Sequence, residues 1–353
     1  MLKVTLAGDG RSFVADPNEP VLEAALRAGI NLPHSCKGGN CSSCRARILS
    51  GRIHYTAGRP LGLMDDEERA GYGLLCQARA DSDLVIEARA VFRASEAPIK
   101  SLPCRVERMQ SLAPDVMAVF LRTPAIEPLT FQAGQYIDVM LTNGRRRSFS
   151  IASPPHDSAL VEIHVRRVTG GEFTESVFTT MKPKALLRIE GPIGQFIYRE
   201  DAARRAVFIA GGTGFAPVKS MLRHALEQGS KRAFHFYWGA RRPADLYEHA
   251  LVEEWARRYP NLDYRPVLSQ PEPADAWKGA AGWVHEIALA QERSFADAVV
   301  YASGPPAMID AIRHDYPKAG LAAGDLLFDS FDYAPDSPAR LAGSASNDRT
   351  QPQ

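Results

Sequence analysis

The pattern of apolar and polar positions changes twice along the chain and divides it into three segments. Up to about residue 92, short alternating runs at Lys3–Leu6 and Ser12–Ala15 predict strands. Pro20–Ala28 has apolar residues at helical spacing and Gly29 just past its end, which predicts a helix. A loop rich in Gly and Cys follows, and Asp83–Arg89 predicts a last strand. This first segment reads as a small α+β domain.

The second and third segments differ in how their strands are connected. Residues 104–202 contain short runs separated by turn residues, which predicts an antiparallel β-barrel. Residues 203–334 alternate apolar strands with helices, which predicts an α/β domain with a parallel sheet. Residues 93–103, with two prolines, are expected to form a linker, and residues 335–353 a disordered tail. The predicted strands are Val116–Arg122, Tyr136–Leu141, Val161–Val165 and Leu186–Glu190 in the second segment, and Ala206–Ala210, Ala233–Trp238, Asp263–Leu268 and Ala298–Tyr301 in the third.

Composition narrows the class of protein. The 353 residues suffice for two or three domains, and 45% hydrophobic with 24% charged residues is a globular composition. A formal net charge of +1 gives no overall attraction to nucleic acid. No apolar run approaches the ~20 residues of a membrane span, and the N-terminal residues do not resemble a signal peptide. We therefore expect a cytoplasmic protein that does not insert into membranes. We also expect it to be monomeric.

Four of the five cysteines have the spacing of an iron–sulfur site. Cys36, Cys41 and Cys44 form C-x4-C-x2-C, and Cys76 follows much later, which is the plant-type [2Fe–2S] spacing. A zinc site would usually pair two such short motifs, and a Rieske cluster would need two histidines where only His34 lies nearby. Disulfides are not expected in a reducing compartment. The fifth cysteine, Cys104, lies outside this spacing and is expected to be a core residue.

Two elements of the predicted barrel suit a flavin. In Arg147-Ser148-Phe149-Ser150, arginine can bind phosphate, phenylalanine can stack on the flavin ring and a hydroxyl can bond a ring nitrogen. Alone, the tetrad is explained better by a solvated basic edge at Arg145–Arg147. The second element comprises His164, Val165, Arg166, Gly170, Gly171 and Thr174, in which a Gly pair leads into a helix that Thr174 is expected to cap. Alone, it could be merely a strand, a turn and a helix, but together the two elements favour FAD.

Two glycine turns of the third segment suit a nicotinamide dinucleotide. The first, Gly211-Gly212-Thr213-Gly214, ends an apolar strand and precedes a helix that starts near Pro217. The second contains Ser303, Gly304 and Pro305, ends another strand and opens a helix with Met308 in its first turn. Either turn alone could serve only tight packing. Both would lie at the carboxyl ends of parallel strands, where open α/β sheets bind their ligands.

These motifs resemble two known families. Residues 1–92 are similar to plant-type ferredoxin domains, which implies a β-grasp fold. Residues 104 to about 333 resemble the ferredoxin–NADP reductase superfamily: Arg147–Ser150 matches its flavin motif, Gly211–Gly214 its pyrophosphate loop, and Asp329-Ser330-Phe331 its C-terminal element. The resemblance implies catalytic roles for Ser150, Ser303 and Phe331. Ser303 stands where the superfamily usually has cysteine, which implies altered efficiency or ring placement.

The order of the domains is similar to reductase components of bacterial oxygenases, such as those of benzoate dioxygenase, phenol hydroxylase and methane monooxygenase. It is also similar to CDP-6-deoxy-3,4-glucoseen reductase. The resemblance implies electron flow from NAD(P)H through FAD and the [2Fe–2S] cluster to a separate oxygenase or dehydratase protein. A redox-sensing relay with a vestigial nicotinamide site is the alternative that Ser303 favours.

The choice between NADH and NADPH depends on the residues that meet the ribose. Gly239 and Arg241 follow a predicted strand, and Arg241 with Arg242 could attract the 2′-phosphate of NADPH. Asp245 would repel that phosphate, and oxygenase reductases of similar sequence use NADH. We expect NADH, with NADPH as the alternative.

Overall fold

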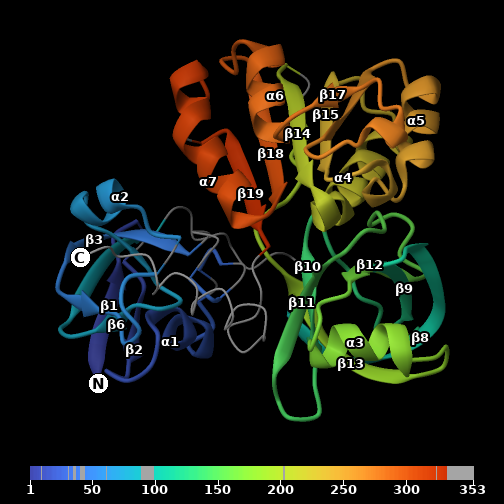
Figure 1. Ribbon diagram of the computed structural model, residues 1–353. Helices are drawn as coiled ribbons and strands as arrows, with labels where there is room; N and C mark the ends of the chain where they lie inside the picture. Colours follow the sequence, from blue (N-terminus) through green and yellow to red (C-terminus); the bar gives the residue numbers. More distant parts are fainter. Residues whose placement is uncertain are drawn as a thin grey trace, which may run out of the picture. The chain divides into compact units, whose positions relative to one another are not determined.

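The computed structural model describes residues 1–8, 10–30, 32–34, 37–39, 44–60, 62–88, 99–201, 203–322 and 324–331. The chain forms two compact units, Met1–Pro98 and Ile99–Gln353 (Figure 1). Within the described residues, no helix is both long and apolar enough to cross a bilayer.

The first unit is a small mixed sheet with one helix packed on it. The five-stranded sheet has the order β2-β1-β7-β3-β5, in which β1 is antiparallel to β2 and parallel to β7. The helix buries Val21, Leu22, Ala24 and Ala25 in the core of this unit. This arrangement confirms the expected β-grasp fold. The elements are β1 (Leu2–Leu6), β2 (Ser12–Ala15), α1 (Val21–Arg27), β3 (Arg45–Ser50), β4 (Ile53–His54), α2 (Asp65–Arg69), β5 (Tyr72–Leu74), β6 (Arg79–Ala80) and β7 (Leu84–Ala88).

The second unit begins with an antiparallel barrel, the flavin lobe. Its six strands have the order β11-β10-β13-β8-β9-β12, and a bridge between Ile151 and Ile163 joins the two ends of the sheet. Both isoleucines lie in the apolar core of the barrel. The elements are β8 (Lys100–Ala113), β9 (Val116–Arg122), β10 (Tyr136–Met140), β11 (Arg146–Ser150), β12 (Val161–Arg166), α3 (Glu172–Thr179) and β13 (Leu186–Ile193).

The predicted linker extends too far, because β8 begins at Lys100, inside residues 93–103. Lys100 pairs with Gly191 and Pro103 with Arg188, so this stretch is the start of a strand. Its side chains alternate between exposed and buried positions. The proline that suggested a linker is an exposed member of this strand. Residues 93–98 and 335–353 lie outside the described residues.

The rest of the second unit is an α/β domain, the nicotinamide lobe. Its parallel sheet has the order β17-β16-β15-β14-β18-β19, and helices cover both faces (Figure 1). Consecutive strands lead from β14 toward β17 on one side, while β18 returns to the other side of β14. The point between β14 and β18 is therefore where an open α/β sheet binds its ligand. The elements are β14 (Arg205–Gly211), η1 (Gly212–Gly214), α4 (Phe215–Glu227), β15 (Phe234–Ala240), η2 (Pro243–Asp245), α5 (His249–Arg258), β16 (Leu262–Leu268), η3 (Pro273–Asp275), β17 (Ala280–Ala281), α6 (Val284–Glu292), β18 (Ala298–Gly304), α7 (Pro306–Asp315), η4 (Tyr316–Ala319) and β19 (Leu326–Ser330).

Strand β14 explains why this sheet is stable between two helical layers. Phe208 packs in the cluster that contains residues of α4 and α5, while Val207 and Ile209 pack in the cluster that contains residues of α6 and α7. All three side chains are fully buried, as expected for a central parallel strand. The same first cluster includes Phe196 of the flavin lobe, so the two lobes share part of one core.

Candidate functional site

Two of the four predicted cluster ligands lie side by side in the first unit. Cys44 precedes β3 and Cys76 follows β5, and both are buried. The backbone N–H of Cys76 lies 3.5 Å from the sulfur of Cys44, within reach of a weak hydrogen bond. Such N–H···S contacts stabilise the negative charge of iron–sulfur sites. Cys36 and Cys41 lie outside the described residues.

A glycine close to these cysteines is closely enclosed. Gly39 has a φ of +83°, and a Cβ added to it would lie 2.8 Å from the Gln77 side chain and 2.9 Å from Pro60. The amide of Gln77 donates to the carbonyl of Lys37 at 2.8 Å, which holds this part of the loop against the Cys76 turn. The buried thiols and the tight glycine fit a cluster-binding loop.

The remaining cysteine belongs to the second unit. Cys104 lies in β8 and belongs to the barrel core, as the sequence predicted. Burial raises the pKa of its thiol to about 12, so it stays protonated and unreactive.

Strand β11 carries the predicted flavin tetrad. Ser148 donates to Asp138 of the neighbouring strand at 2.6 Å, and the half-buried Phe149 contacts Phe173 of α3 with ring centroids 5.2 Å apart. Arg147 is half-buried and donates to the carbonyl of Arg146 at 2.9 Å. Ser148 and Phe149 thus tie the tetrad to the neighbouring strand and to α3.

The last residue of the tetrad reaches the nicotinamide lobe. The buried Ser150 hydroxyl lies 3.4 Å from a carboxylate oxygen of Asp329 in β19. Asp329 is the register partner of Ser303 in β18, and the backbone N–H of Phe331 donates to Gly304 at 2.8 Å. The structure therefore brings the three predicted catalytic residues, Ser150, Ser303 and Phe331, into one region at the carboxyl ends of β18 and β19.

The two predicted glycine turns pack directly against each other at the same sheet edge. A Cβ added to Gly214 would lie 2.0 Å from the carbonyl oxygen of Ser303, and one added to Gly211 would lie 2.7 Å from Pro305. Met308 also contacts this region, because the same hypothetical Cβ of Gly211 would lie 3.1 Å from its sulfur. Pro217 lies in the first turn of α4, which begins at Phe215 and so two residues earlier than predicted. Glycine is required where two backbones approach this closely.

Buried polar atoms around these turns support a ligand site. The hydroxyls of Ser303 and Ser330 have no hydrogen-bond partner among the residues that the structure describes. The same holds for one terminal nitrogen of the Arg166 guanidinium, which lies beside Gly212, while the Nε of Arg166 pairs with Asp115 at 3.4 Å. Buried polar groups are normally paired, so these atoms fit groups that hold a nucleotide when it is bound.

The second predicted flavin element is divided between different surroundings. Gly170 has a φ of +74° and Gly171 is the N-cap residue of α3. The prediction that Thr174 caps this helix is wrong, because Thr174 lies inside the first turn, where its hydroxyl bonds with Val168 at 3.2 Å. Val165 is buried in the barrel core.

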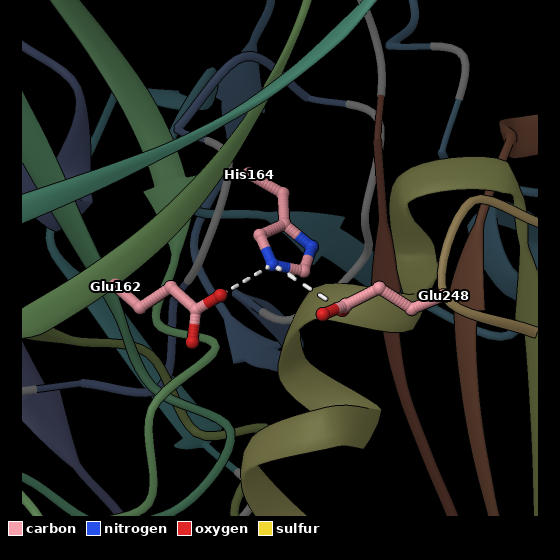
Figure 2. A group of neighbouring side chains, drawn as sticks. All are labelled: Glu162, His164 and Glu248. Atoms are coloured by element: carbon pink, nitrogen blue, oxygen red, sulfur yellow. Dashed lines mark hydrogen bonds and ion pairs between the residues drawn. The ribbon is translucent and has the colours of Figure 1, made fainter. Parts of the chain in front are cut away.

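His164 lies in a buried group of charged residues between the two lobes. Its ring nitrogens lie 3.0 Å from Glu162 and 3.0 Å from the Tyr247 hydroxyl, so both are taken by protein groups. Glu162, His164 and Glu248 point toward a common centre (Figure 2), a geometry that could hold a metal ion. However, the ammonium of Lys219 lies 2.9 Å from Glu162 and 2.7 Å from Glu248, so the protein supplies the cation itself.

The charge of this group is stabilised against its burial. Burial alone would raise the pKa of Glu162, but the hydrogen bond with His164 and the charge of Lys219 outweigh it and hold the pKa at about 2. A cavity of about 350 Å³ borders the group and is lined by Glu162, Lys219 and Glu248 together with Arg108 and other residues. Because its pKa is held at about 2, Glu162 is ionised throughout the physiological pH range.

The residues after β15 show how the charges near the predicted ribose site are arranged. Arg241 pairs with Asp245 at 3.1 Å, and Arg242 pairs with Glu272. A Cβ added to Gly239 would lie 2.6 Å from Val284 at the start of α6, so only glycine fits there.

Comparison with known proteins decides the family. Three domain families match the chain: a 2Fe-2S iron-sulfur cluster binding domain over residues 4–81, an oxidoreductase FAD-binding domain over 103–198 and an oxidoreductase NAD-binding domain over 208–314. The CDP-6-deoxy-L-threo-D-glycero-4-hexulose-3-dehydrase reductase of Yersinia pestis is 37% identical over 94% of this chain and 98% of its own length. The chain belongs to the iron–sulfur flavoprotein reductases.

Further relatives of the reductase act in other systems. The phenol hydroxylase P5 protein of Acinetobacter pittii is 34% identical, over 97% of this chain and 98% of its own. The crystal structure of a cytochrome P450 reductase from Amycolatopsis matches with a TM-score of 0.75 and 30% identity, covering 94% of this chain and 99% of the other. The predicted fold class, enzyme class and cofactor set are thereby confirmed.

Local sequence patterns did not reveal the partners of β12 in the reductase. Glu162, His164 and Arg166 are polar residues at every second position of a buried strand, and this signal could have indicated a polar contact face. Their partners Lys219 and Tyr247 lie far along the chain, and nothing in the local pattern connects them.

Trp283 is a second residue that sequence reasoning missed. It is 59% exposed, directly precedes α6 and neighbours Val284, which contacts Gly239. Tryptophan is a poor N-cap residue and its side chain makes no capping hydrogen bond. The signal in the sequence was an aromatic residue directly before a helix, a position that favours small polar residues, but its exposure follows from the fold.

Proposed function

We propose that the reductase is a cytoplasmic, monomeric enzyme that oxidises NADH and passes single electrons to a separate acceptor protein. When bound, FAD supplies hydride acceptance and conversion to one-electron transfer, and the [2Fe–2S] cluster supplies the exit for electrons. The observation that carries the proposal is the junction of Gly211–Gly214 with Ser303–Pro305, opposite the Ser150–Asp329 contact. The proposed domains are residues 1–92, 100–202 and 203–334, with the second beginning at the first residue of β8.

The flavin would be held mainly by the flavin lobe, the antiparallel barrel of the second unit. Arg147 and the N–H groups near Gly170 and Gly171 would bind its phosphates, because a guanidinium and a helix N-terminus both favour anions. Ser150 would hydrogen-bond the flavin ring, with Asp329 orienting its hydroxyl from 3.4 Å. Phe331 would border the ring from the C-terminal element.

The nicotinamide dinucleotide would lie along the sheet edge of the other lobe. The backbone of Gly211, Gly212, Thr213 and Gly214 would accommodate the diphosphate, and Arg166 would neutralise it from beside Gly212. The free hydroxyl of Ser303 would orient the nicotinamide. Trp283, exposed beyond Gly239, would stack on the adenine.

NADH rather than NADPH is supported by the pairing of both candidate arginines. Asp245 neutralises Arg241, and Glu272 neutralises Arg242. A 2′-phosphate would have to compete with these carboxylates for the arginines. A ribose hydroxyl, in contrast, can donate a hydrogen bond to the carboxylate of Asp245. We expect kcat/KM for NADH to exceed that for NADPH by at least about tenfold, since tenfold corresponds to 1.4 kcal/mol.

The acceptor is proposed to be an oxygenase or hydroxylase component. The phenol hydroxylase P5 protein and the reductase components of terephthalate 1,2-dioxygenase support it. The 37% identical hexulose-dehydrase reductase supports the alternative, a dehydratase of deoxysugar synthesis. Assays of the reductase with each class of terminal protein would decide between them.

An anaerobic titration tests the proposal directly. The purified chain, containing flavin, two irons and two labile sulfides, is mixed with NADH and then, separately, with NADPH. We expect NADH to bleach the flavin absorbance and to produce the EPR signal of a reduced [2Fe–2S] cluster. A flavin that neither nucleotide bleaches would favour the redox-sensing relay instead.

A further inference from the structure

Strand β12 presents a row of polar side chains to the nicotinamide lobe. Glu162, His164 and Arg166 occupy every second position of the strand and therefore lie on one face of it. Glu162 bonds with Lys219 of α4, and Arg166 lies beside Gly212 of the dinucleotide turn. One strand of the flavin lobe therefore contacts both the turn and the helix that follows it.

Lys219 is bound from three directions. Its ammonium donates to one oxygen of Glu162 at 2.9 Å and to the two oxygens of Glu248 at 2.7 and 2.8 Å. The side chains of Lys219 and Glu162 are 6% and 7% exposed, so water screens this contact poorly. An ammonium has three N–H donors, and here carboxylates from two lobes can satisfy all of them.

The location of Lys219 connects this contact with the proposed nucleotide site. It lies in the second turn of α4, which continues directly from Gly212–Gly214. The indole N–H of Trp238 also donates to the carbonyl of Gly212 at 3.0 Å, which ties the turn to β15. Because a helix is stiff over one turn, the place where Lys219 is held fixes where the turn lies relative to β12.

We propose that Lys219 is a positioning residue, which with Glu162 and Glu248 sets the distance between the nucleotide turn and the flavin lobe. The proposal rests on the proposed function, in which the Gly211–Gly214 turn receives NADH. A buried ion group contributes little net stability because desolvation opposes its attraction, but its short directional bonds restrict geometry. Hydride transfer depends steeply on such geometry. The effect on rate should therefore exceed the effect on folding.

The test replaces the whole ion group with neutral side chains of similar shape in the full-length, flavin-loaded chain. The triple variant Lys219→Met, Glu162→Gln and Glu248→Gln avoids the uncompensated buried charge that Lys219→Met alone would leave. We expect the limiting rate of flavin reduction by NADH to fall by about tenfold or more, with the thermal midpoint and the FAD content close to wild type.

Hydrogen–deuterium exchange of the nucleotide-free proteins gives a readout that does not depend on activity. Amides of Gly211–Lys219 should exchange faster in the triple variant, while those of β15 should be unchanged. Arg223→Met is the matched control: it lies one helical turn after Lys219 and pairs across the lobes with Asp157 at 3.3 Å, but Asp157 is 60% exposed. This control should keep the flavin-reduction rate within about twofold of wild type, because exposed pairs contribute little.

Two results would overturn the proposal. One is a triple variant that is reduced by NADH at the wild-type rate. The other is a rate loss that disappears when it is corrected for the fraction of folded, FAD-containing protein, which would make the ion group only structural. The wild-type rate tests the proposed function, and the ratio of variant to wild type tests Lys219, so the two can fail separately.

Discussion

Strands β11 and β12 belong to the same barrel, and both carry residues that the sequence pointed to as flavin ligands, yet their surroundings differ. In β11 the first four side chains are exposed or half-buried, and only Ser150 is buried. In β12 every residue but the last, Arg166, is buried. Polar residues on β11, which is partly exposed, can still be reached by a ligand. Glu162 and His164 on the buried β12 bind protein groups instead. Polar residues of the same kind therefore have different roles, depending on whether other parts of the protein cover the strand.

Arg166 gives the largest expected effect, because it is the member of the β12 row that lies beside Gly212. Arg166→Met should raise the dissociation constant of NADH by more than about a hundredfold, equivalent to about 3 kcal/mol, through loss of a charge-assisted contact. FAD content should change little. The apparent dissociation constant is taken from the dependence of the flavin-reduction rate on NADH concentration in anaerobic stopped-flow mixing, and an unchanged constant would remove Arg166 from the nucleotide site.

Arg147 tests the other strand. Arg147→Ala should weaken FAD retention by about 1.5–3 kcal/mol, because a phosphate contact to a charged group is lost. NADH binding should be less affected, the reverse of the pattern expected for Arg166. Equilibrium dialysis against FAD measures the retention. Equal FAD affinity in variant and wild type would place the phosphates elsewhere.

Glu162 gives a smaller effect that appears only in acid. Its pKa of about 2 in the folded chain lies below the usual 4.5, so its contribution to stability is complete above pH 4.5 and is lost as the pH falls toward 2. Glu162→Gln removes this dependence, and the thermal midpoint of the variant should fall less between pH 5 and pH 3. Between pH 5 and pH 3, the free energy of unfolding of wild type should fall by on the order of 1–2 kcal/mol more than that of the variant.

A matched variant separates this effect from general acid sensitivity. Glu175 pairs with Arg167 at 2.8 Å in the same lobe, but the glutamate is 28% exposed. Glu175→Gln should alter the acid dependence less than Glu162→Gln does. If both variants showed the same acid dependence of stability, the buried Glu162 would contribute no more to it than the partly exposed Glu175.

The sequence predicted best the features that depend on neighbouring residues. The glycine turns at Gly211–Gly214 and Ser303–Pro305 were recognisable because strand, turn and helix follow one another directly. The start of β8 was missed because Pro103 favours a loop locally, while pairing with β13 decides the outcome. Thr174 suggests a cap because threonine favours that position, but Gly171 occupies it.

Contacts between distant segments could not be predicted from these patterns. Lys219 is separated from Glu162 by 57 residues, and its position in α4 reads equally well as a solvated helix residue. Folding buries its ammonium beside Glu162 and Glu248 and makes the pairing with carboxylates necessary. The place of Trp283 beside Gly239 of β15 likewise depends on the packing of α6, whose first residue Val284 contacts Gly239.

In the proposed mechanism, electrons enter through the nicotinamide and flavin lobes and leave through the cluster. The most direct test compares full-length Cys76→Ser with Cys104→Ser during anaerobic mixing with NADH and subsequent reduction of cytochrome c. We predict that flavin bleaching stays at the wild-type rate in both variants. Cytochrome c reduction and the [2Fe–2S] EPR signal should be lost in Cys76→Ser and kept in Cys104→Ser. A Cys76→Ser protein that lacks its iron and still reduces cytochrome c at the wild-type rate would contradict the account.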